Sequence, residues 1–481
     1  MVLNWLDYAV IGLYLLAIVA FGSWFARFQK TTRDYFLTDR SVPWWAICFT
    51  IVATETSTLS FIGVPAGAYT GNMTFLQLAM GYIVGRVLVS VLFIPAYFRG
   101  ELFTSYELLQ RRFGAPVKNV AAIIFLVTRT FADGIRLFAT ALVIAVVTQM
   151  PVTLTVLVLG IAMIVYTVRG GVAAVIWTDV VQMFIYVGGA LIIFFGLLQL
   201  IPGGWTEVTQ VGAAHFQVFD FSTDPLRVYT FWAGLLGGIA LTLATHGTDQ
   251  FLVQRLLSAR SAKQASAGLV LSGVIVFAQF ALFLVIGVML YTFYQGTPLP
   301  RPLTRNDEVL PLFVITSLPH GVAGFIVAAI VAAALSPSIN SMASTTVNDF
   351  YLKYFKPNAD EGTLMRVSRQ ATIFWGVAQI AVAIAAQWLQ QSVIDSGLGV
   401  LSLAAGPVLG AFLIGVLTKR VGARAMLTGM LTGVAVLGWV WGTGATAWSW
   451  FALIGASVTM LIAAAASLVI SETPAAAPAR R

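Results

Sequence analysis

Cysteine and histidine are scarce in this chain. Its 481 residues include one cysteine, Cys48, and three histidines. A single thiol excludes an intrachain disulfide and a metal site built from cysteine ligands. The sequence also lacks a phosphate-binding loop of the Walker type, a cluster of His and Cys, and a defensible Ser/His/Asp arrangement. We therefore predict that the protein is not an enzyme.

Charged residues are few as well. They make up 10% of the chain, against roughly 25% in a typical soluble domain, whereas 59% of the residues are hydrophobic. A soluble core stops growing at roughly 250–300 residues, so this much apolar sequence could not all be shielded from water. Glycine and phenylalanine are plentiful, as in packed membrane helices. The composition predicts an all-α polytopic membrane protein.

Apolar stretches that can cross a bilayer, which takes about 20 residues, recur along the chain. The first contains Asp7, follows no basic run and lacks a signal-peptide cleavage pattern, so we interpret it as a retained helix. We predict about thirteen spans, at 6–26, 43–70, 74–98, 117–149, 152–168, 171–201, 229–254, 264–294, 321–347, 367–391, 396–418, 424–443 and 447–470.

The loops between these spans alternate in basic residues. Most of the 27 lysines and arginines lie in one set of loops, whereas the other set holds only Arg227, Arg301 and Arg305. Cytoplasmic loops carry the excess of basic residues, which predicts an outer N-terminus and an inner C-terminus in the cell inner (plasma) membrane. The net charge is thus a topology signal, and no nucleic-acid partner is predicted. The tail 471–481 is predicted to be disordered.

The second span is unusually polar. Between Ala53 and Pro65 it carries the carboxylate of Glu55 and several hydroxyl groups. Pro65 has no N–H and clashes with the carbonyl four residues earlier, so we expect the helix to break or kink there. Irregular backbone at membrane depth is tolerated only where it lines a cavity or is buried in protein. Freed carbonyls beside a carboxylate suit a hard cation; the alternative is a simple kink whose hydroxyls bond their own helix.

The ninth span shows a similar pattern. Pro337 is expected to free the carbonyl of Ala333, and Ser336 places a hydroxyl nearby. A free carbonyl with a hydroxyl again suits a cation. The alternative is close helix packing through the small Ala and Ser residues.

Other ionisable residues within spans are functional candidates, because charge is costly there. Arg129 and Asp133 are four residues apart and are expected to pair along one helix face. Arg136 would then be left to meet an anionic substrate, or merely Glu55 or Asp179. His246 is expected to be a hydrogen-bonded structural residue.

Several short sequence motifs follow one another in order between positions 36 and 351. They are Phe36-Leu37 with Arg40-Ser41; Thr54 to Tyr69; Arg169-Gly170-Gly171 with Trp177-Thr178-Asp179 and Gln182; Thr248-Asp249-Gln250 with Val253-Gln254-Arg255; Leu318-Pro319 to Ser336; and Asn340-Ser341 with Asp349-Phe350-Tyr351. Together they resemble the sodium/solute symporter family, which includes sodium/glucose, sodium/proline, sodium/sialic acid and sodium/iodide transporters.

The resemblance implies a leucine-transporter-like fold with two inverted repeats of five helices. The first helix of each repeat, 43–70 and 229–254, would be broken near the membrane midplane, where substrate and ions bind. The resemblance implies one transport domain, 1–470. It would consist of an extra N-terminal helix (6–26), a first repeat (43–201), a second repeat (229–418) and two C-terminal helices (424–470).

The resemblance also implies a sodium site, formed by the carbonyls of Ala53, Thr56 and Ala333 and the hydroxyl of Ser336. Here the chain departs from the family, which has two adjacent hydroxyl residues where this sequence has Ser336-Pro337. One hydroxyl ligand is therefore lost. In some members an acid that matches Asp179 takes part in a second sodium site.

Substrate contacts of the sugar- and sialic-acid-transporting members map near six residues: Glu55, Ser57, Ser60, Gln77, Arg136 and Thr242. Glu55 matches an acid that the proline-transporting members need for sodium coupling. Arg136 lies roughly where the sialic-acid members place a carboxylate-binding arginine.

We therefore predict a secondary-active, sodium-coupled symporter that imports a small polar organic solute of the sugar, sugar-acid or carboxylate class by alternating access. The predicted cofactor is the sodium ion. We expect the protein to be surrounded by membrane lipid and to transport as a monomer. One alternative is the same fold driven by protons, with Glu55 as the carrier. Another is a substrate sensor or channel, which the short segment after residue 470 disfavours because it offers no signalling module.

Overall fold

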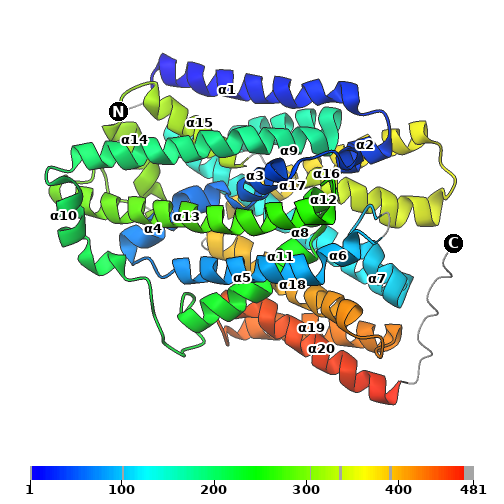
Figure 1. Cartoon of the computed structure of the whole chain (residues 1–481). Coiled ribbons are helices and arrows are strands. Elements are labelled where there is room, and N and C mark those ends of the chain that lie inside the picture. The colour runs from blue at the N-terminus through cyan, green and yellow to red at the C-terminus, as the bar shows by residue number, and fades with distance from the viewer. Residues whose placement is uncertain (1–2, 100–101, 304, 335–337, 389–392, 471–481) are drawn as a thin grey trace.

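The helices lie side by side in one elongated bundle, with α1 along one edge and α19 and α20 along the opposite edge (Figure 1). This computed structural model describes residues 3–99, 102–303, 305–334, 338–388 and 393–470. Within those ranges all the regular secondary-structure elements are helices. One isolated β-bridge joins Val42 to Ala259. The predicted all-helical fold is confirmed.

In the first half of the chain, each predicted span contains helical residues. They are α1 (Trp5–Trp24), α3 (Trp44–Glu55), α4 (Thr58–Thr70), α5 (Leu76–Leu92), α6 (Ile94–Tyr97), α8 (Ala115–Thr148) and α9 (Val152–Leu200). Short helices lie in the predicted loops: η1 (Phe25–Phe28), α2 (Thr32–Leu37), η2 (Thr38–Arg40), α7 (Tyr106–Phe113), α10 (Gly204–Val211) and η3 (Ala213–Phe216).

The second half follows the same plan. Its span helices are η4 (Ala233–Gly237), α11 (Gly238–Gly247), α12 (Gln250–Leu257), α13 (Ala262–Gly296), α15 (Val322–Ala334), α16 (Ile339–Ser344), η6 (Thr345–Phe355), α17 (Glu361–Ala385), η7 (Ala386–Trp388), α18 (Val393–Leu417), α19 (Ala423–Thr443), η8 (Trp448–Trp450) and α20 (Phe451–Val469). The loop 295–320 contains η5 (Asn306–Glu308) and α14 (Val309–Ser317).

Length and composition alone do not identify every predicted span. Within the described ranges, seven helices are long and apolar enough to cross a membrane, or up to eight when the bent pair of α3 and α4 is one span. Two of the apolar helices, Ala233–Gly247 and Val322–Ala332, are shorter than a full span.

The two spans predicted at 152–168 and 171–201 meet within α9 at Gly171. This glycine has φ +57° and ψ −152°, which is not helical. A side chain there would also place its Cβ 2.6 Å from the Tyr35 carbonyl oxygen. Only glycine combines that backbone conformation with so close an approach.

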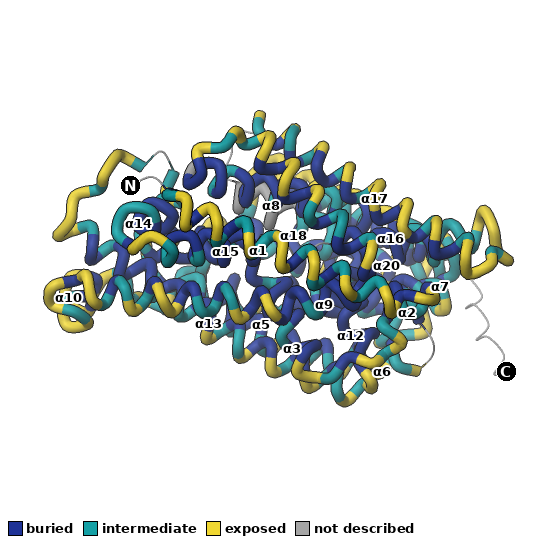
Figure 2. The backbone as a smooth tube through the Cα atoms, turned by 90° about the horizontal axis from the view of Figure 1, so that it is seen from above, coloured by how far each residue is buried: buried dark blue, intermediate teal, exposed yellow. Residues whose placement is uncertain are grey.

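The outer surface of the bundle is apolar. Exposed positions recur along the outer helices, α1 and α17 among them, whereas buried residues fill the interior (Figure 2). Trp5 on α1, Val91 on α5 and Leu461 on α20 are 78%, 66% and 70% exposed. Side chains of this kind are stable on a helix surface when lipid replaces water around them.

Asp7 fastens α1 to the start of α15. Its carboxylate is fully buried and accepts hydrogen bonds from the Gly321 N–H at 2.7 Å and the Gly324 N–H at 2.9 Å. The His320 Nδ1 lies 2.8 Å from its other oxygen. These amides belong to the first turn of α15, where a helix has N–H groups without helical partners. A carboxylate is the natural acceptor for them.

The helix break expected at Pro65 lies elsewhere. α4 continues through Pro65, and the chain bends instead at Thr56 and Ser57, between α3 and α4. A proline removes one N–H, and a membrane helix tolerates this loss where neighbouring groups compensate. Here α13 packs so closely on the Pro65 carbonyl that no side chain would fit at Gly287. Pro65 therefore lies where α4 packs against α13, and it does not break α4.

Candidate functional site

The first discontinuous helix breaks next to a carboxylate. α3 ends at Glu55, and α4 begins three residues later after a bend of 61°. In the break, the Ser57 N–H donates to the Glu55 carbonyl at 3.1 Å, and the Ser60 N–H donates to the Ser57 carbonyl at 2.9 Å. A continuous helix would direct these two N–H groups to the carbonyls of Ala53 and Thr56. The break therefore leaves both of these predicted sodium ligands without their helical donors.

The Thr56 side chain is fixed from α13. Its hydroxyl is fully buried and accepts a hydrogen bond from the Gln279 Nε2 at 2.7 Å. Because the hydroxyl and the carbonyl belong to the same residue, this bond also restricts the movement of that carbonyl.

α15 lies against the start of α4. The Thr58 hydroxyl donates to the Ile330 carbonyl at 3.0 Å. Ala333 follows within the same helix, less than one turn further on. The ninth-span half of the predicted sodium site thus approaches the break, although Ser336 itself lies outside the described residues.

A cavity of about 470 Å³ adjoins the break. Five of the six predicted substrate residues line it: Glu55, Ser57, Ser60, Arg136 and Thr242. Its walls come from α4, α5, α8, α11 and α13. Ligand pockets for small molecules span roughly 300–1,000 Å³, so this cavity is large enough for a small organic solute.

The sixth predicted residue, Gln77, lies outside the cavity lining. Its amide nitrogen donates to the carbonyls of Thr74 at 3.1 Å and Tyr229 at 3.3 Å, and its amide oxygen accepts from the Asp220 N–H at 3.1 Å. Thr74 and Tyr229 do line the cavity. In this structure Gln77 therefore joins two segments of the cavity wall instead of facing the solute.

Aromatic side chains that sequence reasoning missed complete the cavity. In an apolar span, an aromatic residue facing a cavity has the same local pattern as one facing the core, so the sequence gives no signal for them. They are Phe75, Tyr82, Tyr229, Phe251 and Phe280.

Glu55 is part of a buried cluster that joins both discontinuous helices to α5. It forms an ion pair with Arg86, and the Arg86 Nη2 lies 3.3 Å from the His246 Nε2 on α11. A guanidinium only donates, so Nε2 accepts and the imidazole proton is on Nδ1, 3.0 Å from the Thr245 hydroxyl. His246 is a hydrogen-bonded residue, as predicted, and it also lines the cavity. Glu55 is thus paired with Arg86.

Asp179 contacts α3, the helix that ends at the same break, and it pairs with a different arginine. It is fully buried on α9, and one of its oxygens accepts from the Thr50 hydroxyl at 2.6 Å and from the Arg255 Nη2 at 3.1 Å. The predicted candidate for a second sodium site is therefore engaged with Arg255.

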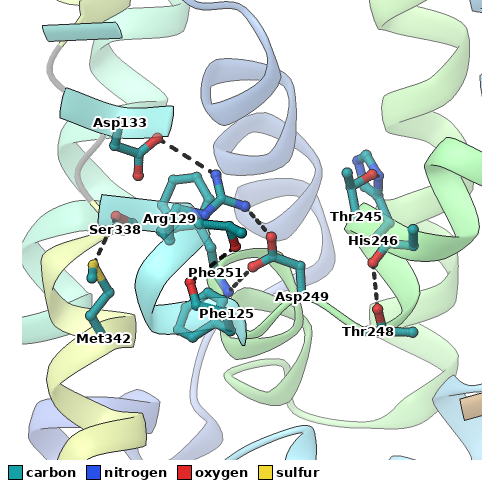
Figure 3. A network of polar contacts seen from close by, with 12 residues as sticks. Phe125, Arg129, Asp133, Thr245, His246, Thr248, Asp249, Phe251, Ser338 and Met342 are labelled. Carbon is teal, nitrogen blue, oxygen red and sulfur yellow. Dashed lines mark hydrogen bonds and ion pairs between the residues drawn. The ribbon is translucent and has the colours of Figure 1, made fainter. Parts of the chain in front are cut away.

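Arg129 links α8 to the second discontinuous helix. It forms the predicted pair with Asp133, with 3.5 Å between Nη1 and Oδ1, and a closer ion pair with Asp249 (Figure 3). Asp249 lies in the break between α11 and α12 and accepts from the Phe251 N–H at 2.9 Å, which caps α12. The sequence showed the pair within α8 through its spacing, but it gave no sign of the contact with Asp249.

The sequence was compared with those of known proteins. The family model described as "sodium:solute symporter family" matches residues 35–433. The human sodium/iodide cotransporter is 30% identical over 453 residues, which cover 90% of this chain and 69% of that protein. The sodium/sialic acid symporter NanT of Aliivibrio fischeri is 30% identical over 471 residues, which cover 95% and 92%.

A solved structure has nearly the same fold. It is the substrate-bound outward-open state of a Na⁺-coupled sialic acid symporter, with a TM-score of 0.90 and 28% sequence identity. The superposition covers 98% of this chain and 99% of that one.

Proposed function

Because this chain belongs to the sodium:solute symporter family, we propose that its transport site consists of the α3–α4 break and the cavity beside it. The protein is a sodium-coupled symporter of a small organic solute, and its relatives are transporters rather than enzymes. It is a multi-pass protein of the inner membrane. The predictions of family, function and sodium cofactor are confirmed.

The sodium site would consist of the carbonyls of Ala53, Thr56 and Ala333 and the hydroxyl of Ser336. One observation carries this proposal: the break redirects two N–H groups away from the carbonyls of Ala53 and Thr56. Sodium, a hard cation, prefers such oxygens. A bound ion would hold the break against α15 and so fix the wall of the adjoining cavity.

The solute would be a sugar acid or another carboxylate. The cavity offers the hydroxyls of Ser57, Ser60 and Thr242 for hydrogen bonds and the guanidinium of Arg136 for a carboxylate. The relatives named for sialic acid transport an anion of this type, and this supports the choice. Gln77 would act through the cavity wall that it holds.

Sodium coupling at this site is a better proposal than proton coupling by Glu55. The permanently charged Arg86 guanidinium pairs with the Glu55 carboxylate, so a bound proton would leave a buried cation without its counter-charge. At Asp179, one carboxylate oxygen already accepts from Arg255, so a second sodium would have to share this carboxylate with the arginine. We therefore assign the coupling role to the first site and keep Asp179 as a secondary candidate.

We further propose thirteen spans in one transport domain, 1–470, with two inverted repeats, an outer N-terminus and an inner C-terminus. The start of α1 and the end of α20 lie at opposite ends of the bundle, which supports an odd number of crossings (Figure 1). The interruptions at 56–57 and 248–249 fall in the first helix of each proposed repeat. One chain contains the whole site, which supports a monomeric transport unit surrounded by lipid.

Uptake into proteoliposomes tests this proposal. Purified protein should accumulate a radiolabelled sugar acid or monocarboxylate from a panel when sodium is high outside, and should stop when potassium replaces sodium. A pH gradient without sodium serves as the control and should drive no uptake. Accumulation with the pH gradient alone would select the proton-coupled alternative, and no sodium-driven uptake of any carboxylate would reject the solute class.

A further inference from the structure

Two cavities meet at one ion pair. Arg129 lines the large cavity at the α3–α4 break, whereas Asp249 lines a small cavity of about 30 Å³ between α8, α11 and α18. Leu401 lines both. The contact between Arg129 and Asp249 therefore stands where the two spaces would join. The small cavity continues past Thr248 toward Tyr106 on α7, at the basic end of the bundle.

This pair connects a continuous helix to an interrupted one. Arg129 lies on α8, a continuous helix of 34 residues. Asp249 sits in the two-residue interruption between α11 and α12, where a small change in backbone dihedrals can move its side chain. Breaking the pair would let the interruption move away from α8 without unfolding either helix.

Arg129 has a second acceptor within reach. The Asp133 Oδ1 lies 3.5 Å from Nη1, one turn along the same helix, and the other Asp133 oxygen has no hydrogen-bond partner among the described residues. Figure 3 shows the guanidinium between the two carboxylates. Removing one partner of a buried ion pair is costly because it leaves an unpaired charge. Arg129 avoids most of that cost, since it keeps Asp133 when it leaves Asp249.

We propose that Arg129 gates the inner exit of the solute cavity by exchanging Asp249 for Asp133. With Asp249 engaged, the large and small cavities are separate and the inner end is closed. With Asp133 alone engaged, the α11–α12 interruption is released and the two cavities join into an exit path. The inference rests on the proposed transport cycle, but it concerns an ion pair to which neither solute binding nor sodium binding was assigned above.

A cysteine reporter tests the gate directly. Ala244 is fully buried and lines the small cavity, so Ala244→Cys in a Cys48→Ser background provides one thiol on the exit path. Its rate of reaction with a hydrophilic maleimide is measured in purified full-length protein, where both faces are accessible. Asp249→Asn should raise this rate about tenfold, because the closed state loses its ion pair. Asp133→Asn, an equally conservative change in the other partner of Arg129, should lower it, because the open state loses the negative charge that balances the arginine.

Opposite effects of the two changes support the exchange. Equal effects in the same direction would show general loosening and overturn it, as would an unchanged rate in both variants. If Asp249→Asn fails to fold, Asp249→Glu should fold and keep a low labelling rate, and a raised rate with Asp249→Glu would also count against the gate. Labelling needs neither sodium nor a solute, so it can fail or succeed independently of the uptake assay.

Discussion

Glu55 at the end of α3 and Arg86 on α5 form an ion pair whose arginine side chain is completely buried. The arginine depends on this carboxylate, because its own side chain is shielded from water. We expect Glu55→Gln or Arg86→Met alone to destabilise the protein by about 3–5 kcal/mol. The double variant should lose less than the sum of the two, since it removes both charges. Thermal unfolding of the purified variants measures this, and strictly additive losses would contradict the pairing.

Sodium affinity should depend on Gln279, although this residue lies outside the proposed ligands. Its amide holds the Thr56 hydroxyl at 2.7 Å. Losing one such bond costs about 0.5–1.5 kcal/mol, so Gln279→Leu should raise the sodium concentration for half-maximal uptake about 2- to 10-fold. Thr292→Val is the control on the same helix, because the Thr292 hydroxyl bonds only the Val288 carbonyl among the described residues. Equal sodium dependence of both variants would disprove the link.

Ser336→Ala should also weaken sodium coupling, since it removes the hydroxyl ligand that the resemblance implies. The measurement is the sodium dependence of initial uptake rates at fixed solute. An unchanged sodium dependence would reject Ser336 as a ligand and leave the carbonyls as the whole of the proposed site.

Solute binding should respond to the hydroxyls that line the cavity. Ser60→Ala and Thr242→Val each remove one hydroxyl and keep the shape of the side chain nearly constant. Each should raise the KM for the transported solute about 2- to 10-fold, the effect of one lost hydrogen bond. Thr70→Val on α4 is the control, because the Thr70 hydroxyl bonds the Ala66 carbonyl and Thr70 is not part of the lining. A KM shift in the control equal to that of the two variants would show that the effect is indirect.

Gly171 should be intolerant of a side chain. Its backbone conformation is available essentially only to glycine, so Gly171→Ala should cost about 1–3 kcal/mol in strain, apart from its clash with the Tyr35 carbonyl. Gly188→Ala on the same helix is the matched control, since a Cβ there meets nothing within 4 Å. Melting temperatures of the two variants give the comparison. Equal melting temperatures would mean that the turn at Gly171 is not constrained.

The loop over the cavity wall should show a small pH dependence through Asp220. The Ser222 N–H and the Arg227 guanidinium hold the pKa of Asp220 below its usual value. A lowered pKa in the folded state stabilises the fold above the unfolded value and loses that contribution as the pH falls through the folded value. Asp220→Asn should therefore lower the melting temperature slightly at pH 7, by the equivalent of about 1 kcal/mol or less, because the pair is partly exposed. The difference from the unmodified protein should shrink toward pH 4, and a difference that grows on acidification would reverse the assignment.

Much of the fold was predictable because helices that cross a membrane need long apolar stretches, which are easy to recognise in a sequence. Apolar stretches correctly predicted long helices such as α1, α13 and α20, and the non-helical residue Gly171 lies at the boundary of two predicted spans. The polar run from Ala53 to Ser60 indicated a cavity, since such residues are costly in lipid. Short helices such as α7 were missed because they do not cross the bilayer and so contain no long apolar stretch. α7 buries Tyr106, Leu109 and Phe113 on one face, a pattern of interface helices.

The partners of the buried charges could not be predicted in the same way. Arg129 and Asp133 are four residues apart on one helix, so spacing alone paired them. Arg86 and Glu55 lie on different helices, and nothing local to either residue identifies the other. Family similarity likewise placed Gln77 near the solute, but the direction of its side chain depends on carbonyls from a distant loop.

The clamp formed by Asp7 has a practical consequence for handling the protein. Because its carboxylate satisfies two amides of α15, the first helix is not a detachable anchor on the outside of the bundle. A truncation that begins after α1 would leave those N–H groups without this acceptor in an apolar medium. Fusions for purification or imaging therefore belong on the C-terminal side, far from the Asp7 contacts.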